Sequence, residues 1–281
     1  MPCQEFSKNV SSLINRELLY WEEVMDIYQH FRPEERQFID QVLGWIDQVQ
    51  MQYVPRLTDF LDPRELEITR MLVGTTGDVR VSFFGGSQEA ERKRAFIYPD
   101  YYEPQIEDYE LTIYELSYSA KFTTLKHRQI LGTLMSVGLK REKFGDIWIE
   151  GDRVQFVVAK EVASYLEMNI SKMGKAGVKF HEVHAEQVMQ VTEQWKESQV
   201  TVSSMRLDTV LSALANISRQ KSQMLVQQGR VKVNWKLVEN PSYEIRESDV
   251  LSTRGIGRMK IFSIEGKTKK DKWKIKCGIQ K

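Results

Sequence analysis

The stretch MRLDTVLSALANISRQKSQMLVQQGRVKVNW, residues 205–235, decides the fold of the C-terminal part of the chain. It predicts two short helices, a glycine stop and a strand. Apolar or small residues recur at helical spacing in both halves, so each helix has one face that can pack against the other. These residues are Leu207, Val210, Leu211, Leu214, Ser222, Leu225 and Val226. Gly229 stands where a helix end favours positive φ, and Val231 and Val233 then alternate with polar neighbours as in a strand.

The opposite face of the second predicted helix is polar and partly basic. Its outward residues are expected to be Arg219, Lys221, Gln223 and Gln227. Arg230 and Lys232 continue that surface onto the strand. The pattern indicates a binding face without a pocket.

This region resembles the RNA-binding domain named after small-subunit ribosomal protein four, here called the S-four domain. The matching residues are Arg206-Leu207-Asp208, Leu211, Ser218-Arg219, Gly229, Val231-Lys232-Val233-Asn234, Val238, Pro241 and Asp249-Val250. Trp235 and Ser248 depart from the family, since glycine is usual at both positions. Both departures are expected in turns, so they concern loop geometry rather than the fold. The resemblance implies an S-four fold of the alpha-L type that binds RNA.

The candidate RNA-binding residues combine cationic and amide side chains. Guanidinium and ammonium groups neutralise phosphates, and an arginine can hold two phosphate oxygens at once. The resemblance places Arg219 on the principal RNA-contact position. The full set is Arg219, Ser218, Lys221, Gln223, Arg230, Lys232, Asn234 and Arg206. Of these, Arg206 is expected, with Asp208, mainly to position the first helix, and an ordinary charged surface is the alternative interpretation of the whole set.

Charge is divided unevenly along the chain. The formal net charge is +1, yet residues 206–281 carry 17 Lys and Arg against 7 Asp and Glu, and the first 205 residues carry 23 against 32. A basic part on a nearly neutral chain concentrates the attraction for phosphate in one place. Residues 266–281 taken alone could also be a solvated basic tail.

Length and composition favour a soluble globular protein. A chain of 281 residues, 41% hydrophobic and 28% charged, is expected to form two or three domains. It has no run of about 18 apolar residues and no signal sequence, so we expect a cytoplasmic protein without membrane insertion. Cys3 and Cys277 suit neither a disulfide framework nor a zinc site, and His181 and His184 lack a third ligand nearby. We therefore expect neither a metal nor a cofactor.

The rest of the chain completes an α+β protein of three domains. Residues 1–62 are predicted to form a helical region, a hairpin of one helix over residues 5–31 and a second helix after Pro33. Residues 63–185 alternate strand and helix patterns and predict a compact, RNA-recognition-like α/β domain. Its expected strands are at Leu66 and Ile68, 79–83, 92–98, 109–118 and the hairpin 147–158, and its expected helices cover 126–137 and 161–173. Residues 186–281 form the S-four domain.

The middle part carries a second resemblance. The segments HRQILGTLM (127–135), GLKR (138–141) and FGDI (144–147), together with the S-four domain, are similar to the bacterial YlmH family. The layout of helical start, RNA-recognition-like middle and S-four end covers nearly the whole chain. The resemblance implies an RNA-binding protein of ribosome rescue and nascent-chain quality control, from a locus near cell-division genes. It also implies its partners: ribosomal RNA, tRNA and the large ribosomal subunit carrying peptidyl-tRNA.

A basic cluster flanks the predicted helix of the middle domain. Its members are His127, Arg128, Lys140, Arg141 and Lys143. They could hold a second RNA segment, although the surrounding domain is acidic.

An enzyme is the alternative to a non-catalytic RNA-binding factor. Arg206-Leu207-Asp208 is like the catalytic aspartate motif of pseudouridine synthases, but that motif belongs to a separate catalytic domain, whereas here it opens the S-four pattern. Gly74-Thr75-Thr76-Gly77 lacks the lysine and the spacing of a P-loop, and no methyltransferase pattern is visible. We expect a factor with no catalytic residues. The alternative is an RNA-modifying enzyme of the pseudouridine synthase or methyltransferase class that docks through the S-four domain.

Overall fold

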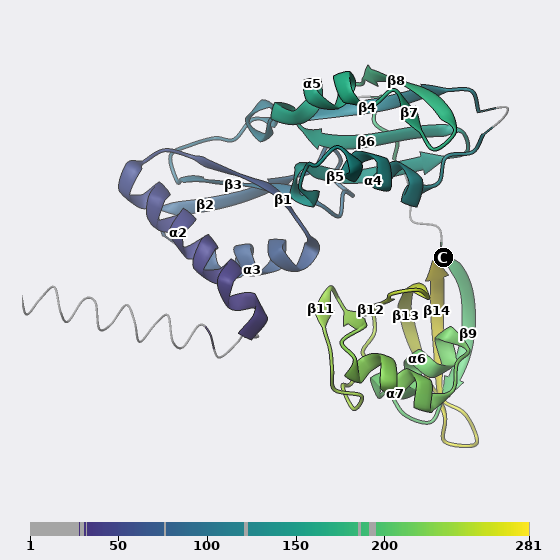
Figure 1. The fold of residues 1–281 in the computed structure, drawn as a ribbon. Helices are drawn as coiled ribbons and strands as arrows, with labels where there is room; N and C mark the ends of the chain where they lie inside the picture. Colours follow the sequence, from purple (N-terminus) through teal and green to yellow (C-terminus); the bar gives the residue numbers. More distant parts are fainter. Residues whose placement is uncertain are drawn as a thin grey trace, which may run out of the picture. The chain divides into compact units, whose positions relative to one another are not determined.

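The computed structural model describes residues 28, 31, 33–75, 77–120, 123–184, 187–190 and 195–280. Apart from residues 28 and 31, the helix expected over residues 5–31 lies outside this set. Helices and strands are mixed throughout, which confirms the α+β class (Figure 1). Among the described residues, no helix is both long and apolar enough to cross a bilayer.

The N-terminal part begins with the helix predicted after Pro33. A short 3-10 turn η1 (Pro33–Glu35) leads into α2 (Arg36–Gln52), which buries Ile39, Val42, Trp45 and Val49 along one side. The following elements are β1 (Arg56–Leu61), α3 (Pro63–Val73), β2 (Val79–Phe84) and β3 (Lys93–Pro99). The three strands form one sheet in the order β1-β3-β2.

The strand expected at Leu66 and Ile68 is wrong, because both residues lie in α3. Asp62 caps this helix: its Oδ1 accepts the backbone N–H groups of Arg64 at 2.9 Å and Glu65 at 3.0 Å. Glu65 in turn accepts the backbone N–H of Asp62 at 2.6 Å. This reciprocal capping, with Pro63 at the first helical position, starts a helix despite the local alternation of apolar residues.

The middle part has the chain order strand, helix, strand, strand, helix, strand of a split βαβ fold. Its elements are β4 (Leu111–Tyr118), α4 (His127–Ser136), β5 (Phe144–Glu150), β6 (Arg153–Ala159), α5 (Lys160–Asn169), β7 (Lys172–Met173) and β8 (Ala176–Glu182). The sheet order is β5-β6-β4-β8-β7, and α4 and α5 cover one face (Figure 1). The helix expected over 161–173 ends early, at Asn169, because the chain turns there into β7.

Aromatic side chains fill the helix side of this middle sheet. The rings of Tyr114, Phe156 and Phe180 lie 5.4 to 5.7 Å apart, centroid to centroid. The Tyr114 hydroxyl donates to Glu167 of α5 at 2.5 Å, so this ring points toward the helices. RNA-recognition domains stack bases on sheet aromatics. Here these three rings build the core instead.

The C-terminal part is a six-stranded sheet with two helices on one face (Figure 1). Its strands are β9 (Lys196–Val202), β10 (Val231–Val233), β11 (Lys236–Leu237), β12 (Val250–Thr253), β13 (Gly257–Lys267) and β14 (Trp273–Gln280), in the order β11-β10-β12-β13-β14-β9. The helices are α6 (Leu207–Ala215) and α7 (Arg219–Gln227). Every apolar or small residue predicted to face inward in these helices is buried, which confirms the pattern that defined them.

The two departures from the S-four pattern keep glycine-like backbone geometry. Asn234 and Trp235 have φ of 48° and 63° and connect β10 to β11 as a two-residue hairpin turn of the type that needs positive φ at both positions. Ser248 has φ of 68°, and Gly229 after α7 has the expected positive φ of 64°. Trp235 and Ser248 therefore adopt the positive φ that glycine allows, although each carries a side chain.

Residues 266–280 do not form a solvated tail. Strand β14 pairs with β13 on one side and β9 on the other. Ile275 and Cys277 are fully buried in the core of this domain. Lys274 and Lys276, which alternate with these two residues, are outward residues of the strand.

Candidate nucleic-acid interface

A buried carboxylate organises the polar face of α6 and α7. Asp208, in the first turn of α6, is 0% exposed. Its Oδ1 accepts the Nε–H of Arg206 at 3.1 Å. Its Oδ2 accepts the Nε–H of Arg219 at 3.2 Å and the amide of Gln223 at 2.7 Å. We call these four residues the Asp208 cluster. It ties the first residue of α7 to the start of α6.

The cluster keeps its central group ionised. Burial alone raises the pKa of Asp208, but hydrogen bonds from Arg206, Gln223 and Arg219 outweigh it and hold the pKa well below its usual range. One negative charge therefore faces two positive charges, and the cluster carries a net positive charge.

The two arginines remain accessible although they are anchored. The side chains of Arg206 and Arg219 are 40% and 54% exposed. Asp208 accepts the Nε–H of Arg219. The two terminal nitrogens of the Arg219 guanidinium have no hydrogen-bond partner among the described residues. The guanidinium is thus held in one orientation with its outer edge in solvent, which suits two-oxygen recognition of a phosphate.

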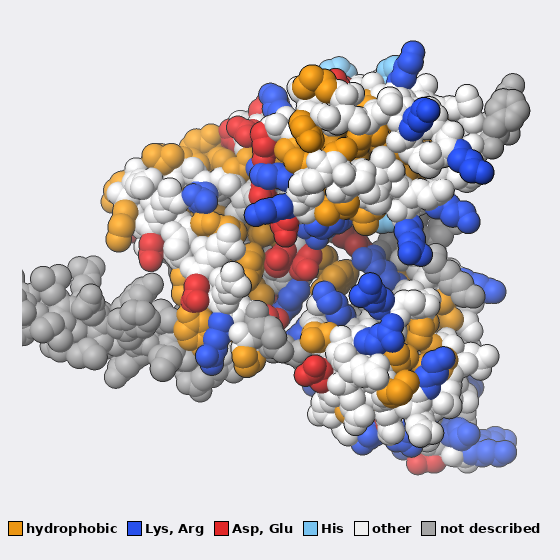
Figure 2. All heavy atoms as spheres, in the orientation of Figure 1, with side chains coloured by type: hydrophobic (Ala, Val, Ile, Leu, Met, Phe, Trp, Pro, Cys, Tyr) orange, Lys and Arg blue, Asp and Glu red, His pale blue; other side chains and the backbone are white. Residues whose placement is uncertain are grey.

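Four further predicted contacts lie on or beside the same helix and strand. Ser218 caps α7, since its hydroxyl accepts the backbone N–H of Lys221 at 3.2 Å. Lys221 and Lys232 are both exposed, the first in the opening turn of α7 and the second on β10. Arg230 is exposed between the two elements. Figure 2 shows Lys and Arg side chains on the visible face of this domain, separated by uncharged surface.

Asn234 is occupied by a structural role. Its amide donates to Asp249 at 2.8 Å, and its carbonyl accepts the backbone N–H of Val250 at 2.8 Å. These bonds fasten the turn after β10 to the start of β12. RNA contact by Asn234 stays a prediction, and one amide hydrogen and one carbonyl lone pair are left for it.

The second basic cluster is split by the fold. Lys143 donates to Asp59 at 2.5 Å and to Glu161 at 2.9 Å, so two carboxylates neutralise it. Arg141 donates to the carbonyls of Phe144 and Gly145, and burial lowers its pKa to about 10. Both cations therefore already have partners: Lys143 pairs with carboxylates of β1 and α5, and Arg141 bonds the backbone at the start of β5. His127, Arg128 and Lys140 are exposed at the two ends of α4 and remain candidates for a second RNA surface.

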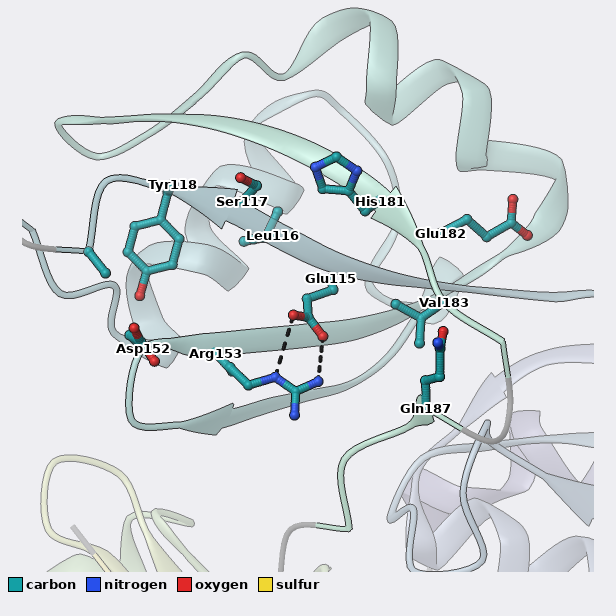
Figure 3. Close-up of a pocket in the computed structure, with 11 residues that line it drawn as sticks. Glu115, Leu116, Ser117, Tyr118, Asp152, Arg153, His181, Glu182, Val183 and Gln187 are labelled. Carbon is teal, nitrogen blue, oxygen red and sulfur yellow. Dashed lines mark hydrogen bonds and ion pairs between the residues drawn. The ribbon is translucent and has the colours of Figure 1, made fainter.

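The open face of the middle sheet has a hollow of about 700 Å³ (Figure 3). Glu115 on β4 accepts hydrogen bonds from Arg153 at 2.7 Å and from Gln155 at 2.7 Å. The hydrogen bond from Arg153 is the main reason that the pKa of Glu115 is lowered. The ionisable residues around the hollow are Glu115, Asp152, Glu182, Arg153 and His181. Three acids against one arginine and one histidine do not favour an RNA phosphate.

Sequence reasoning identified the residues of the polar face but missed what joins them. The sequence predicts that Asp208, with Arg206, positions the first helix. In the structure Asp208 also holds Arg219 and Gln223 of the second helix. The signal for this is a single acidic residue in the apolar face of α6, because a buried carboxylate requires cationic or amide partners nearby. Within the described part of the chain, no group of His, Cys, Asp and Glu is arranged to hold a metal ion.

Three family models match successive parts of the chain. Residues 34–102 match the model of the YlmH N-terminal region, residues 104–187 match a model described as a putative RNA-binding domain in YlmH, and residues 205–251 match the S-four domain. The last range contains the whole Asp208 cluster.

Among the proteins similar to the chain are two relatives and one solved structure. A Bacillus subtilis (strain 168) protein named ribosome-associated protein quality control protein P2 is 47% identical over 256 residues, 91% of this chain and 99% of that protein. An uncharacterized RNA pseudouridine synthase of Aquifex aeolicus (strain VF5) is 39% identical over 51 residues, which are 18% of this chain and 21% of that protein. The structure of the cell division protein ylmH from Streptococcus pneumoniae matches with a TM-score of 0.50 and 34% identity, covering 58% of this chain and 99% of that one.

Proposed function

This chain belongs to the YlmH family, and on that premise we propose that it is a ribosome-associated RNA-binding factor without catalytic activity. Its target is structured ribosomal RNA or tRNA on the large ribosomal subunit, with peptidyl-tRNA present. Its process is ribosome-associated quality control, which places it in the cytoplasm where ribosomes work. The relative from Bacillus subtilis carries that process in its name. The proposal includes a link to cell division, which is supported by the name of the Streptococcus pneumoniae protein.

The Asp208 cluster is the observation that supports this proposal most strongly. An exposed arginine loses side-chain entropy when it binds a phosphate, and a buried carboxylate that already fixes its Nε reduces this loss. Arg219 is fixed in this way while its side chain stays 54% exposed. A surface built only for solubility has no need of such an anchor.

The nature of the surface favours folded RNA. The surface formed by α6 and α7 offers cations and polar groups held by the backbone. The Asp208 cluster contains no aromatic side chain. Such a surface reads phosphate positions and the shape of a helix rather than unstacked bases. A ribosomal RNA helix or a tRNA presents phosphates in fixed positions, which suits arginines that are themselves held in place.

The alternative is an RNA-modifying enzyme, and the Aquifex aeolicus relative is the reason to test it. That match spans 51 residues, about the length of the S-four region, and leaves most of the pseudouridine synthase unmatched. Arg206-Leu207-Asp208 does not have the environment of a catalytic aspartate, because Asp208 is buried and bonded on both oxygens. Incubation with ribosomal RNA or tRNA followed by nucleoside mass spectrometry discriminates the two functions, since a new modified nucleoside would establish the enzyme.

The test of the proposal is fractionation on sucrose gradients followed by immunoblotting. We expect the chain to sediment with free large subunits, most strongly when these carry peptidyl-tRNA, and much less with intact ribosomes or small subunits. An Arg219→Ala chain should shift to the top of the gradient, whereas Gln220→Ala, next to it and equally solvent-facing, should not. A chain found only with small subunits, or with no ribosomal particle at low salt, would refute the ribosomal target.

A further inference from the structure

The C-terminal sheet has a second face, opposite to α6 and α7. Met259, Ile261, Ile275 and Cys277 are fully buried in the core that the helices share. Successive residues of a strand point to opposite faces, so Lys260, Lys274 and Lys276 point away from that core. The strand pairing supports this assignment. Lys260 pairs with Gly278 across β13 and β14, and Lys276 pairs with Gln199 across β14 and β9.

Two aromatic rings lie together on this outer face. Phe262 and Trp195 are half-buried, and their rings meet edge to face with centroids 6.4 Å apart. Gly278 makes room for both: a Cβ at this position would lie 2.6 Å from the Cβ of Trp195 and 2.7 Å from Cζ of Phe262. The rings therefore pack down onto the bare backbone of β14. We call these two residues the aromatic pair.

Cations surround the aromatic pair. The Nζ of Lys276 lies 5.9 Å from the centroid of the Phe262 ring and 2.9 Å from Glu197. Glu265 accepts a hydrogen bond from Gln199, and Glu91 pairs with Arg258, which points to the same side of β13 as Lys260. Lys260 and Lys274 have no acidic partner among the described residues, so the face keeps an excess of positive charge.

We propose that this outer face binds a short single-stranded segment of RNA, with bases stacked on Phe262 and Trp195 and phosphates held by Lys260, Lys274 and Lys276. Aromatic rings on a sheet flanked by lysines are suited to unstacked bases, and a double helix keeps its bases out of reach of such rings. Neighbouring strands lie about 4.8 Å apart, so β13, β14 and β9 together give room for roughly two or three nucleotides. The site is separate from the Asp208 cluster, and both can be occupied at once because they lie on opposite faces of one domain.

The test uses the full chain and two labelled probes in fluorescence anisotropy, a ten-nucleotide oligouridylate and an RNA hairpin of similar charge. Phe262→Leu keeps an apolar side chain over Gly278 but removes the ring. It should weaken oligouridylate binding about fivefold or more, the effect of losing one stacked base, and change hairpin binding less than about twofold. The double variant Lys274→Gln with Lys276→Gln should also weaken oligouridylate binding more than hairpin binding. Arg219→Ala should weaken hairpin binding more than oligouridylate binding, so a failure of this site is distinct from a failure of the proposed function.

Tyr243→Leu is the matched control, because Tyr243 is an aromatic residue, 39% exposed, outside the strands of this face. It should leave oligouridylate binding unchanged. Photocrosslinking of thiouridine-labelled oligouridylate to the wild-type chain, followed by peptide mass spectrometry, needs no variant and should mark Trp195, Phe262 or Lys276. Crosslinks confined to α6 and α7 would overturn the proposal. So would equal competition by polyglutamate, which would make this face a docking site for acidic protein.

Discussion

The Nε of Arg219 lies 3.2 Å from Oδ2 of Asp208, so the first residue of α7 is bonded to a fully buried carboxylate in the first turn of α6. This bond joins two properties that are usually separate in a surface arginine, accessibility and a fixed orientation. It also sets two distinct expectations, one for the loss of the arginine and one for the loss of the carboxylate.

Replacing Arg219 with Ala should weaken binding to a ribosomal RNA helix about tenfold or more and leave the domain folded. A charge-assisted hydrogen bond contributes roughly 1.5 to 3 kcal/mol, whereas an ion pair of a half-exposed arginine contributes about 0.2 to 1 kcal/mol to stability. Asp208 keeps Arg206 and Gln223 as partners in this variant. Anisotropy measures the binding, and hydrogen exchange of α6 and α7 measures the stability. Loss of binding together with rapid exchange would instead make Arg219 a structural residue.

The packing faces of α6 and α7 could be predicted because helical periodicity is local. Leu207, Val210 and Leu211 lie within one turn of each other, and the sequence alone shows that they share a face. The bond between Asp208 and Arg219 could not be predicted in this way. It depends on how two helices are set against each other, and no pattern along the chain encodes that angle.

The strand β14 of the C-terminal sheet has a recognisable strand pattern that its lysines obscure. Ile275 and Cys277 alternate with Lys274 and Lys276, the period of a strand, yet the excess of lysines reads first as a charge run. At α3 the opposite happened: alternation suggested a strand, and the cap formed by Asp62 and Glu65 decided for a helix. In both places the structure follows the less conspicuous of two sequence patterns. These are the alternation at β14, rather than the lysine run, and the capping residues at α3, rather than the alternation.

Replacing Leu225 with Ala should destabilise the C-terminal domain by roughly 2 to 5 kcal/mol. The side chain is 6% exposed and packs in the core beneath α7, so its loss leaves a cavity. Met224→Ala, at the neighbouring position with 48% exposure, should cost much less. Hydrogen exchange across β10 and β12 measures both variants. Equal protection in the two variants would contradict the burial of Leu225.

Replacing Ser248 with Gly should stabilise the domain by about 0.5 to 1 kcal/mol. Ser248 has φ of 68°, a conformation that costs free energy for a residue with a Cβ, and this cost exceeds the entropy that glycine adds to the unfolded chain. The same exchange at Ser252, inside strand β12, should destabilise by a similar amount because the backbone there is extended. Thermal unfolding of the two variants should move in opposite directions. A fall in both would show that the serine at 248 makes a contact worth more than the strain.

Replacing Asp208 with Asn should remove a pH-dependent part of the stability of this domain. The pKa of Asp208 is lowered in the folded chain, since hydrogen bonds from Arg206, Gln223 and Arg219 outweigh the burial that raises it. A group whose folded pKa lies below its unfolded value of about 3.9 contributes stability that is fully present above that value. The contribution is lost as the pH falls through about 4 toward the folded pKa. At neutral pH the variant should be less stable than wild type by about 2 to 4 kcal/mol, since Arg206 and Arg219 lose a charged partner.

This difference between wild type and Asp208→Asn should shrink steadily below about pH 4, because wild-type Asp208 then begins to be protonated as well. Urea unfolding followed by fluorine NMR of a fluorotryptophan-labelled chain resolves the C-terminal domain through the signal of Trp235. Asp271→Asn is the control: its side chain is 81% exposed in a surface pair with Lys267, and its difference from wild type should stay small at every pH. A gap between wild type and Asp208→Asn that stays constant down to pH 2 would mean that the carboxylate acts through its shape alone. Arg219 would then be oriented by packing rather than by the charge beneath it.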